Sequence, residues 1–183
     1  YAHIPVNVGA PPPAAKKWVY INGERDRVQL HEPRGREKAF IDLGVNNLFA
    51  CVTTTGRALL YRGGPIKAEY EYWSREASIW QSVRDRCRNH GLPWERWHRL
   101  YLRAVEKRTR RTRNLKRAAV RHLVRLLWEE GVDTIFVGYP YMIAQENGGK
   151  WATNVWGYRQ TISWLAEVAQ EYGIRVFIVD ESK

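Results

Sequence analysis

Hydrophobic and polar positions first divide the chain into strand-like and helix-like stretches. Three short apolar runs follow one another at 39–45, 48–55 and 57–63, and each has the length and the β-branched or aromatic content of a strand. Only brief turns rich in Asn, Thr and Gly separate them, and short links of this kind join antiparallel neighbours. The pattern therefore predicts a three-stranded antiparallel sheet.

Longer stretches with helical periodicity come next. One covers 69–91, where Gly91 is a stop signal, and a second runs to Gly131. In the second helix the apolar stripe is expected on four residues, namely Leu115, Ala119, His122 and Leu126. The remaining elements are a strand, a helix and a strand, at 133–138, 155–172 and 175–180.

The resulting order, β-β-β-α-α-β-α-β, is that of the ribonuclease H-like fold. We therefore predict an α/β domain over 38–183, with a mixed five-stranded sheet whose parallel part is joined by helical crossovers. The first strand would lie at the centre, between the second and the fourth, with both faces largely covered. Residues 1–37 contain a hairpin signal at Asn22-Gly23 and then a polar hinge, so we expect them to be the end of a separate β-unit.

Composition narrows the function. The chain has 30 Lys and Arg against 19 Asp and Glu, a net charge of +11, and this excess favours a polyanionic partner such as nucleic acid. An Arg-rich solvated surface is the alternative.

No apolar run approaches the ~18 residues of a membrane span, and two isolated cysteines are typical of a reducing, intracellular setting. We expect a cytoplasmic, nucleoid-associated protein.

One acid, Asp42, interrupts an apolar strand. A lone ionised carboxylate on a covered central strand costs several kcal/mol unless it is paired. A divalent cation is a fitting partner, because carboxylate oxygens suit Mg²⁺ or Mn²⁺. The alternative is that Asp42 caps a turn amide near Gly44.

A basic stretch at 107–117 is the second candidate feature. Seven of its eleven residues are cations, which fits a helix that contacts phosphates. The predicted nucleic-acid-binding residues are these seven together with one lysine of the loop at 141–154: Lys107, Arg108, Arg110, Arg111, Arg113, Lys116, Arg117 and Lys150. Trp151 and Trp156 are candidates for base stacking, although core packing is favoured for Trp156 and Trp164.

Several of these motifs together resemble a known family. "FIDLGVNNLFACVTTTG", "YRGGPIKAEYEYWSRE", the Arg-rich helix that leads into "DTIFVGYP", "IAQENGGKWATNVWGY" and "AQEYGIRVFIVDESK" are similar, in order, to the RuvC-type domain of the TnpB/OrfB proteins of insertion sequences, which are related to type V CRISPR nucleases. The resemblance covers 39–183, and the upstream strands look like the end of that family's β-barrel wedge domain.

The resemblance implies an RNA-guided DNA endonuclease with an Asp-Glu-Asp metal site. Asp42 matches the first acid. The family's second acid ends the fourth strand, where this chain has Gly138. Glu146 is the first candidate for a replacement and Glu181 the second, and each has the alternative of being an ordinary loop acid. The family's third acid and its zinc ribbon would follow Lys183, so we expect a piece of a longer protein.

Three functions are thus predicted, in order of preference. The first is a transposon-associated endonuclease that hydrolyses phosphodiesters with Mg²⁺ or Mn²⁺, using guide RNA and target DNA as partners and Asp42, Glu146 and Glu181 as candidate catalytic residues. The second is an inactive relative that binds RNA and DNA as a guide-dependent repressor. The third is a module for nonspecific nucleic-acid binding. Zinc is expected only in the missing ribbon, and the oligomeric state is left open.

Overall fold

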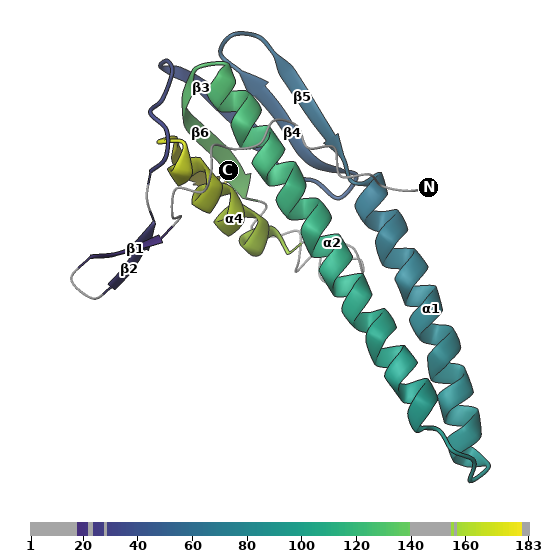
Figure 1. Cartoon of the computed structure of the whole chain (residues 1–183). Helices are drawn as coiled ribbons and strands as arrows, with labels where there is room; N and C mark the ends of the chain where they lie inside the picture. The colour runs from purple at the N-terminus through teal and green to yellow at the C-terminus, as the bar shows by residue number, and fades with distance from the viewer. Residues whose placement is uncertain (1–17, 22–23, 28, 140–154, 156, 181–183) are drawn as a thin grey trace.

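The computed structural model describes residues 18–21, 24–27, 29–139, 155 and 157–180. The strands are β1 (Trp18–Ile21), β2 (Glu24–Arg27), β3 (Glu37–Asp42), β4 (Asn47–Thr53), β5 (Ala58–Arg62), β6 (Val132–Tyr139) and β7 (Arg175–Asp180). The helices are α1 (Gly64–Asn89), α2 (Glu95–Glu129) and α4 (Tyr158–Glu171). From β3 onward the order of elements is the predicted one (Figure 1).

Five strands form one mixed sheet in the order β5-β4-β3-β6-β7. β3 pairs antiparallel with β4 and parallel with β6, and β6 pairs parallel with β7. Because β3 lies between the second and fourth strands of this sheet, its predicted central place is confirmed. The sheet, with the helices that cross over between its parallel strands, gives the ribonuclease H-like fold expected from the sequence.

The core lies between one face of this sheet and the helices α2 and α4. Ala39 and Ile41 of β3 are buried there against α2 residues that include Val120, Leu123 and Leu127. The buried stripe of α2 is thus one position away from the predicted one. His122 is exposed, and its Nδ1 lies 2.7 Å from the Tyr61 hydroxyl oxygen. Both neighbouring stripes carry leucine, so periodicity alone did not separate them.

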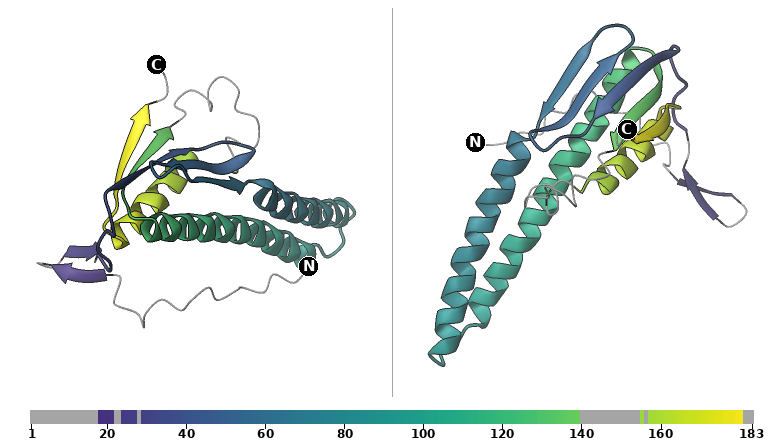
Figure 2. Two further views of the ribbon diagram at one scale, coloured as in Figure 1. Left: turned by 90° about the horizontal axis from the view of Figure 1, so that it is seen from above. Right: turned by 180° about the vertical axis from the view of Figure 1, so that it is seen from behind.

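The opposite face of the sheet is open among the described residues. Phe40 is 50% exposed and Val52 is 52% exposed, and the rings of Phe40, Phe136 and Phe177 stack across three strands at 5.4 and 5.6 Å. In the two further views the helices α2 and α4 lie on one side of the sheet only (Figure 2). Within the described part of the chain only one face of β3 is covered, whereas the sequence led us to expect that both would be.

The predicted polar hinge is docked rather than loose. The amide of Leu30 donates to the Glu171 carbonyl oxygen at 2.7 Å, and the Trp128 indole donates to the Glu32 carbonyl oxygen at 2.7 Å. The Arg34 guanidinium lies 3.7 Å from the centre of the Trp128 ring. These contacts tie the lead-in to β3 to the ends of α2 and α4. β1 and β2 form a separate two-stranded sheet, and their assignment to an upstream domain stays a prediction.

α1 and α2 form a long antiparallel hairpin that projects beyond the sheet (Figure 1). Aromatic side chains join the two helices near its tip, where the rings of Trp80 and Trp97 stack at 5.8 Å. The base of the hairpin continues from β5 and leads through α2 into β6. The basic stretch at 107–117 therefore lies on α2 within this hairpin.

Candidate acidic site and nucleic-acid interface

Asp42 ends the central strand and lies on its open face. Residues of β3 alternate, so that Ala39 and Ile41 face the helices while Phe40 and Asp42 face away. The Asp42 side chain is exposed, which removes the burial cost on which the sequence argument for a metal rested. The carboxylate is instead available to a ligand from solvent.

Asp42 lines a small cleft formed by the turn between β3 and β4. The cleft has a volume of about 210 Å³ and is lined by Asp42, Gly44, Val45, Asn46, Asn47 and Ala50. The Gly44 amide donates to the Asn47 carbonyl oxygen at 3.1 Å, so the turn amide expected as an alternative partner of Asp42 is already bonded. The Asn46 side-chain oxygen accepts from Lys67 of α1 at 3.0 Å. The turn is therefore held in place without using the Asp42 carboxylate.

Gly138 occupies the position on β6 where the family would place its second acid. Ile41 pairs with Val137, so the next residues along the two parallel strands, Asp42 and Gly138, come to the same edge of the sheet. Gly138 pairs in turn with Val179 of β7. A side chain at 138 would lie beside Asp42 on the open face, and glycine supplies no ligand there.

Tyr158 is a neighbour of Asp42 that the sequence did not reveal. It is the first residue of α4 and follows Gly157, whose φ of 54° is in the left-handed region. Burial, and next the negative charge of Asp42, raise the pKa of Tyr158 to about 12. Among the described residues its buried hydroxyl has no hydrogen-bond partner. Nothing in the local motif distinguishes this tyrosine from an ordinary core residue.

The donor set around Asp42 fits a hard cation in kind, because carboxylate and amide oxygens are the ligands that Mg²⁺ prefers. It is incomplete in number within the described part of the chain, where no group of three or more His, Cys, Asp or Glu residues is placed to hold a metal ion. The predicted partners Glu146 and Glu181, and Lys150 of the same loop as Glu146, lie outside the described residues. Their roles remain predictions.

The cations of the basic stretch of α2 contact two neighbouring helices, α1 and α4. Three cations contact α1. Lys107 Nζ lies 4.8 Å from the centre of the Trp73 ring, and the Arg108 guanidinium lies 5.0 Å from the centre of the Tyr70 ring. Arg111 forms an ion pair with Glu69 at 3.3 Å. These side chains hold the hairpin together at the same time as they add positive charge.

Two more cations contact α4. The guanidinium of Arg117 lies 5.6 Å from the centre of the Trp164 ring. Lys116 is only 8% exposed, its Nζ donates to the Val155 carbonyl oxygen at 2.8 Å, and burial lowers its pKa below the ordinary value. The structure thus places Lys116 inside the fold, where a structural role accompanies any contact with nucleic acid.

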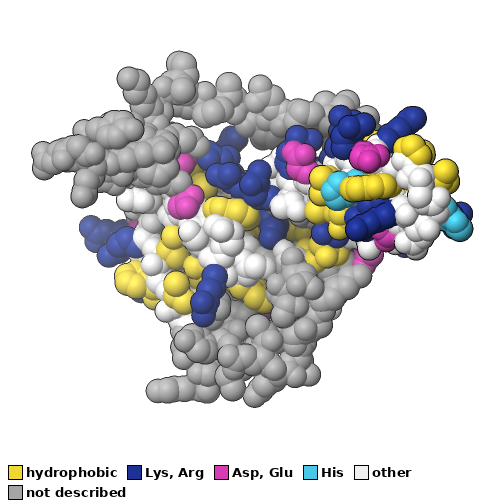
Figure 3. Space-filling view, turned by 90° about the horizontal axis from the view of Figure 1, so that it is seen from below, with side chains coloured by type: hydrophobic (Ala, Val, Ile, Leu, Met, Phe, Trp, Pro, Cys, Tyr) yellow, Lys and Arg dark blue, Asp and Glu magenta, His cyan; other side chains and the backbone are white. Residues whose placement is uncertain are grey.

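Arg110 and Arg113 are the exposed members of the stretch for which the described structure shows no ion pair or ring contact. Seen from below, Lys and Arg side chains gather in the middle of the molecular face, with few acids among them (Figure 3). This distribution is suited to a phosphate backbone. None of the described helices is long and apolar enough to cross a membrane.

The sheet order and the acid at the end of its central strand define an RNase H-like α/β domain. The chain belongs to the OrfB_IS605 family, described as probable transposase, whose profile matches residues 3–144. It is 39% identical over 184 residues to the TnpB-like protein ORF457 of Acidianus two-tailed virus, a match that spans 99% of this chain and 40% of that relative.

Solved structures give the same fold at much lower identity. A cryo-EM structure of a Cas12f1–sgRNA–target DNA complex matches with a TM-score of 0.63 and 13% identity, over 85% of this chain and 31% of that one. A CRISPR-Cas12f ternary complex matches with a TM-score of 0.59 and 11% identity, over 87% and 32%. The chain spans under half the length of each of these proteins.

Proposed function

We propose that this chain is the metal-dependent nuclease domain of a transposon-encoded, RNA-guided DNA endonuclease. The observation that carries the proposal is Asp42, an exposed carboxylate in an open cleft at the end of the central strand of an RNase H-like sheet. Membership of a transposase family supports the biological setting. The solved Cas12f1–sgRNA–target DNA complex, which shares the fold, supports the choice of partners.

The chemistry follows from the position of the acid. Asp42 would hold a Mg²⁺ or Mn²⁺ ion, with further ligands from Glu146 or Glu181, and a bound ion would activate water and stabilise the leaving oxygen of a phosphodiester. The pairing of β3 on both sides fixes the point at which Asp42 presents its oxygens. Cations of α2, Arg110 and Arg113 first, would hold the polyanionic strand by charge.

Cleavage by the full-length protein tests this function. We expect Asp42→Ala to abolish Mg²⁺-dependent cleavage of a guide-matched DNA while nucleic-acid binding is retained, because the carboxylate serves the reaction and not the docking of the strand. Glu106→Gln is the matched control, since Glu106 is an exposed acid of α2 that does not line the Asp42 cleft. Undiminished cleavage by Asp42→Ala would overturn the assignment.

One observation favours a second function, that of a relative which binds guide RNA and DNA without cutting. Gly138 leaves the position beside Asp42 without a carboxylate. If this function is correct, the full-length wild type binds its guide and target but leaves the DNA intact, and Gly138→Glu gains metal-dependent cleavage. Cleavage by the wild type would exclude it.

A further inference from the structure

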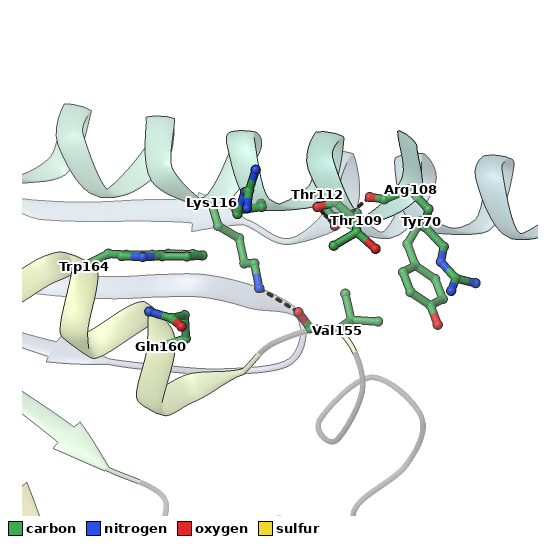
Figure 4. A pocket seen from close by; sticks show the side chains of 9 residues that line it. Tyr70, Arg108, Thr109, Thr112, Lys116, Val155, Gln160 and Trp164 are labelled. Carbon is green, nitrogen blue, oxygen red and sulfur yellow. Dashed lines mark hydrogen bonds between the residues drawn. The ribbon is translucent and has the colours of Figure 1, made fainter. Parts of the chain in front are cut away.

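A larger cleft, which shares no lining residue with the Asp42 cleft, lies where α2, α4 and the residue Val155 meet the base of α1. Its volume is about 460 Å³, within the range of small-molecule sites. α2 contributes Arg108, Arg113 and Lys116, and α4 contributes Gln160 and Trp164. Figure 4 shows the α2 and α4 side chains lying around the same space. The cleft therefore combines cations, an amide and a flat ring.

Trp164 belongs both to the lining of this cleft and to the packing against the core. Trp164 is half-buried and packs against the core, which agrees with the packing role expected for it, and it lines the cleft as well. Lys116 Nζ lies 5.7 Å from the centre of its ring. Trp164 thus places an aromatic ring beside positive charge. Proteins that bind single-stranded nucleic acids use this combination.

The polar groups of the cleft indicate which kind of ligand it can bind. The hydroxyls of Thr109 and Thr112 donate to carbonyl oxygens of their own helix, so the cations are the principal donors. Arg113 is exposed at this cleft, and Arg108 uses one guanidinium nitrogen on Ser74 at 3.2 Å. These groups fit a phosphate. The exposed amide of Gln160 offers both a donor and an acceptor, as the edge of a base requires.

We propose that this cleft holds one unpaired nucleotide of a nucleic-acid strand, with its base stacked on Trp164 and its phosphate neutralised by Arg113 and Arg108. A paired base cannot enter, because both of its faces are already stacked within the duplex. The inference rests on the nucleic-acid binding of the proposed function but not on cleavage. RNA and DNA offer the same base and phosphate chemistry, and the test distinguishes them.

The experiment compares full-length variants by fluorescence anisotropy with four 12-nucleotide probes. These are oligothymidylate, oligouridylate, an abasic DNA strand of the same length and a DNA duplex. We expect Trp164→Leu to weaken binding of the two single strands that carry bases by about tenfold, as loss of base stacking does. The abasic strand and the duplex should bind as they do to the wild type. The tighter of the two base-bearing strands identifies the nucleic acid that the cleft takes.

Arg113→Gln should weaken binding of all single strands and reduce the slope of log K against log salt by about one. Arg103→Gln is its matched control, because Arg103 is an exposed cation of the same helix outside the cleft. Trp164→Phe keeps a stacking ring and should restore most of the affinity, which separates stacking from misfolding. Equal losses on the base-bearing and abasic strands in Trp164→Leu, or equal effects of Arg113→Gln and Arg103→Gln on oligothymidylate, would overturn the proposal.

Failure here is distinguishable from failure of the proposed nuclease. Asp42→Asn should leave all four affinities unchanged, whereas it removes cleavage. A protein that cuts its target but shows no base-dependent loss in Trp164→Leu contradicts the nucleotide cleft alone. A protein that shows the base-dependent loss but never cuts supports the cleft and contradicts the nuclease.

Discussion

Single residues decide what the open face of the sheet can do. Asp42 is exposed because the helices that the structure describes cover the face that Ala39 and Ile41 present, so its charge has no burial cost to offset. Gly138, its neighbour on β6, has no carboxylate that could bind a cation together with Asp42. Lys116 shows the reverse relation, since a residue expected to contact phosphate is buried and bonded to Val155. The identity of an acid or a cation could be read from the sequence, whereas its exposure depended on which sheet face the helices cover.

Burial also gives Cys51 of β4 a measurable pH dependence. Burial, and next the Glu130 carboxylate, raise the pKa of the Cys51 thiol to about 11 from 9.0. The folded state therefore retains a proton that the unfolded state loses first, and this contribution to stability is complete below pH 9 and lost as pH rises through 11. We expect the free energy of unfolding to fall by on the order of 2 kcal/mol over that window because of this group.

Denaturant unfolding at intervals from pH 8 to 11.5 measures the effect. Cys51→Ala should show a shallower fall than the wild type, while Cys87→Ala, which alters the half-buried thiol of α1, should keep the wild-type slope. Parallel pH profiles for the wild type and Cys51→Ala would contradict the prediction.

At the scale of elements, local sequence patterns were sufficient to predict every strand of the five-stranded sheet and the three helices α1, α2 and α4. Most bounds lie near the predicted ones because the runs end at turn residues, such as Gly131 after α2, whose φ of 82° favours glycine. α1 is an exception at its start, since it begins at Gly64 and not at residue 69. Contacts outside the predicted strand pairing could not be predicted. Residues 30–34 are docked by backbone hydrogen bonds to the end of α4 and by contacts with the Trp128 side chain at the end of α2, and neither leaves a mark in the local hydrophobic pattern.

The close approach of the β3 lead-in to the α2–β6 turn is the element-scale contact that a small substitution can test. A Cβ at Gly35 would lie 2.7 Å from the Gly131 carbonyl oxygen, which also accepts from the Glu37 amide at 3.1 Å. Gly35→Ala should therefore shift this backbone and lower the free energy of unfolding by about 1–3 kcal/mol. Chemical denaturation measures this change.

Gly64→Ala provides the comparison, because a Cβ at that position of α1 meets nothing within 4 Å. Its free energy of unfolding should stay within about 0.5 kcal/mol of the wild type. A Gly35→Ala protein as stable as Gly64→Ala would show that the two loops are not in the contact described.

At the scale of the whole molecule, the acid and the cations lie on different parts of one scaffold. Asp42 ends the central strand, while the basic stretch of α2 lies between α1 and α4 and leads away along the hairpin. The fold could be predicted because the order of strands and helices can be read from local sequence patterns, whereas the role of Asp42 as a metal ligand stays a prediction. The cleft around Trp164 could not, because it is assembled from α1, α2, α4 and Val155, which only the tertiary structure brings together.

The central claim is that Asp42 is the anchor of a divalent metal site. Mn²⁺ titration of the full-length protein, followed by the electron paramagnetic resonance signal of the free ion, tests it most directly. Saturable binding is predicted for the wild type and for Glu106→Gln, with affinity reduced at least about tenfold in Asp42→Asn. Equal Mn²⁺ affinity in Asp42→Asn and the wild type would contradict the account.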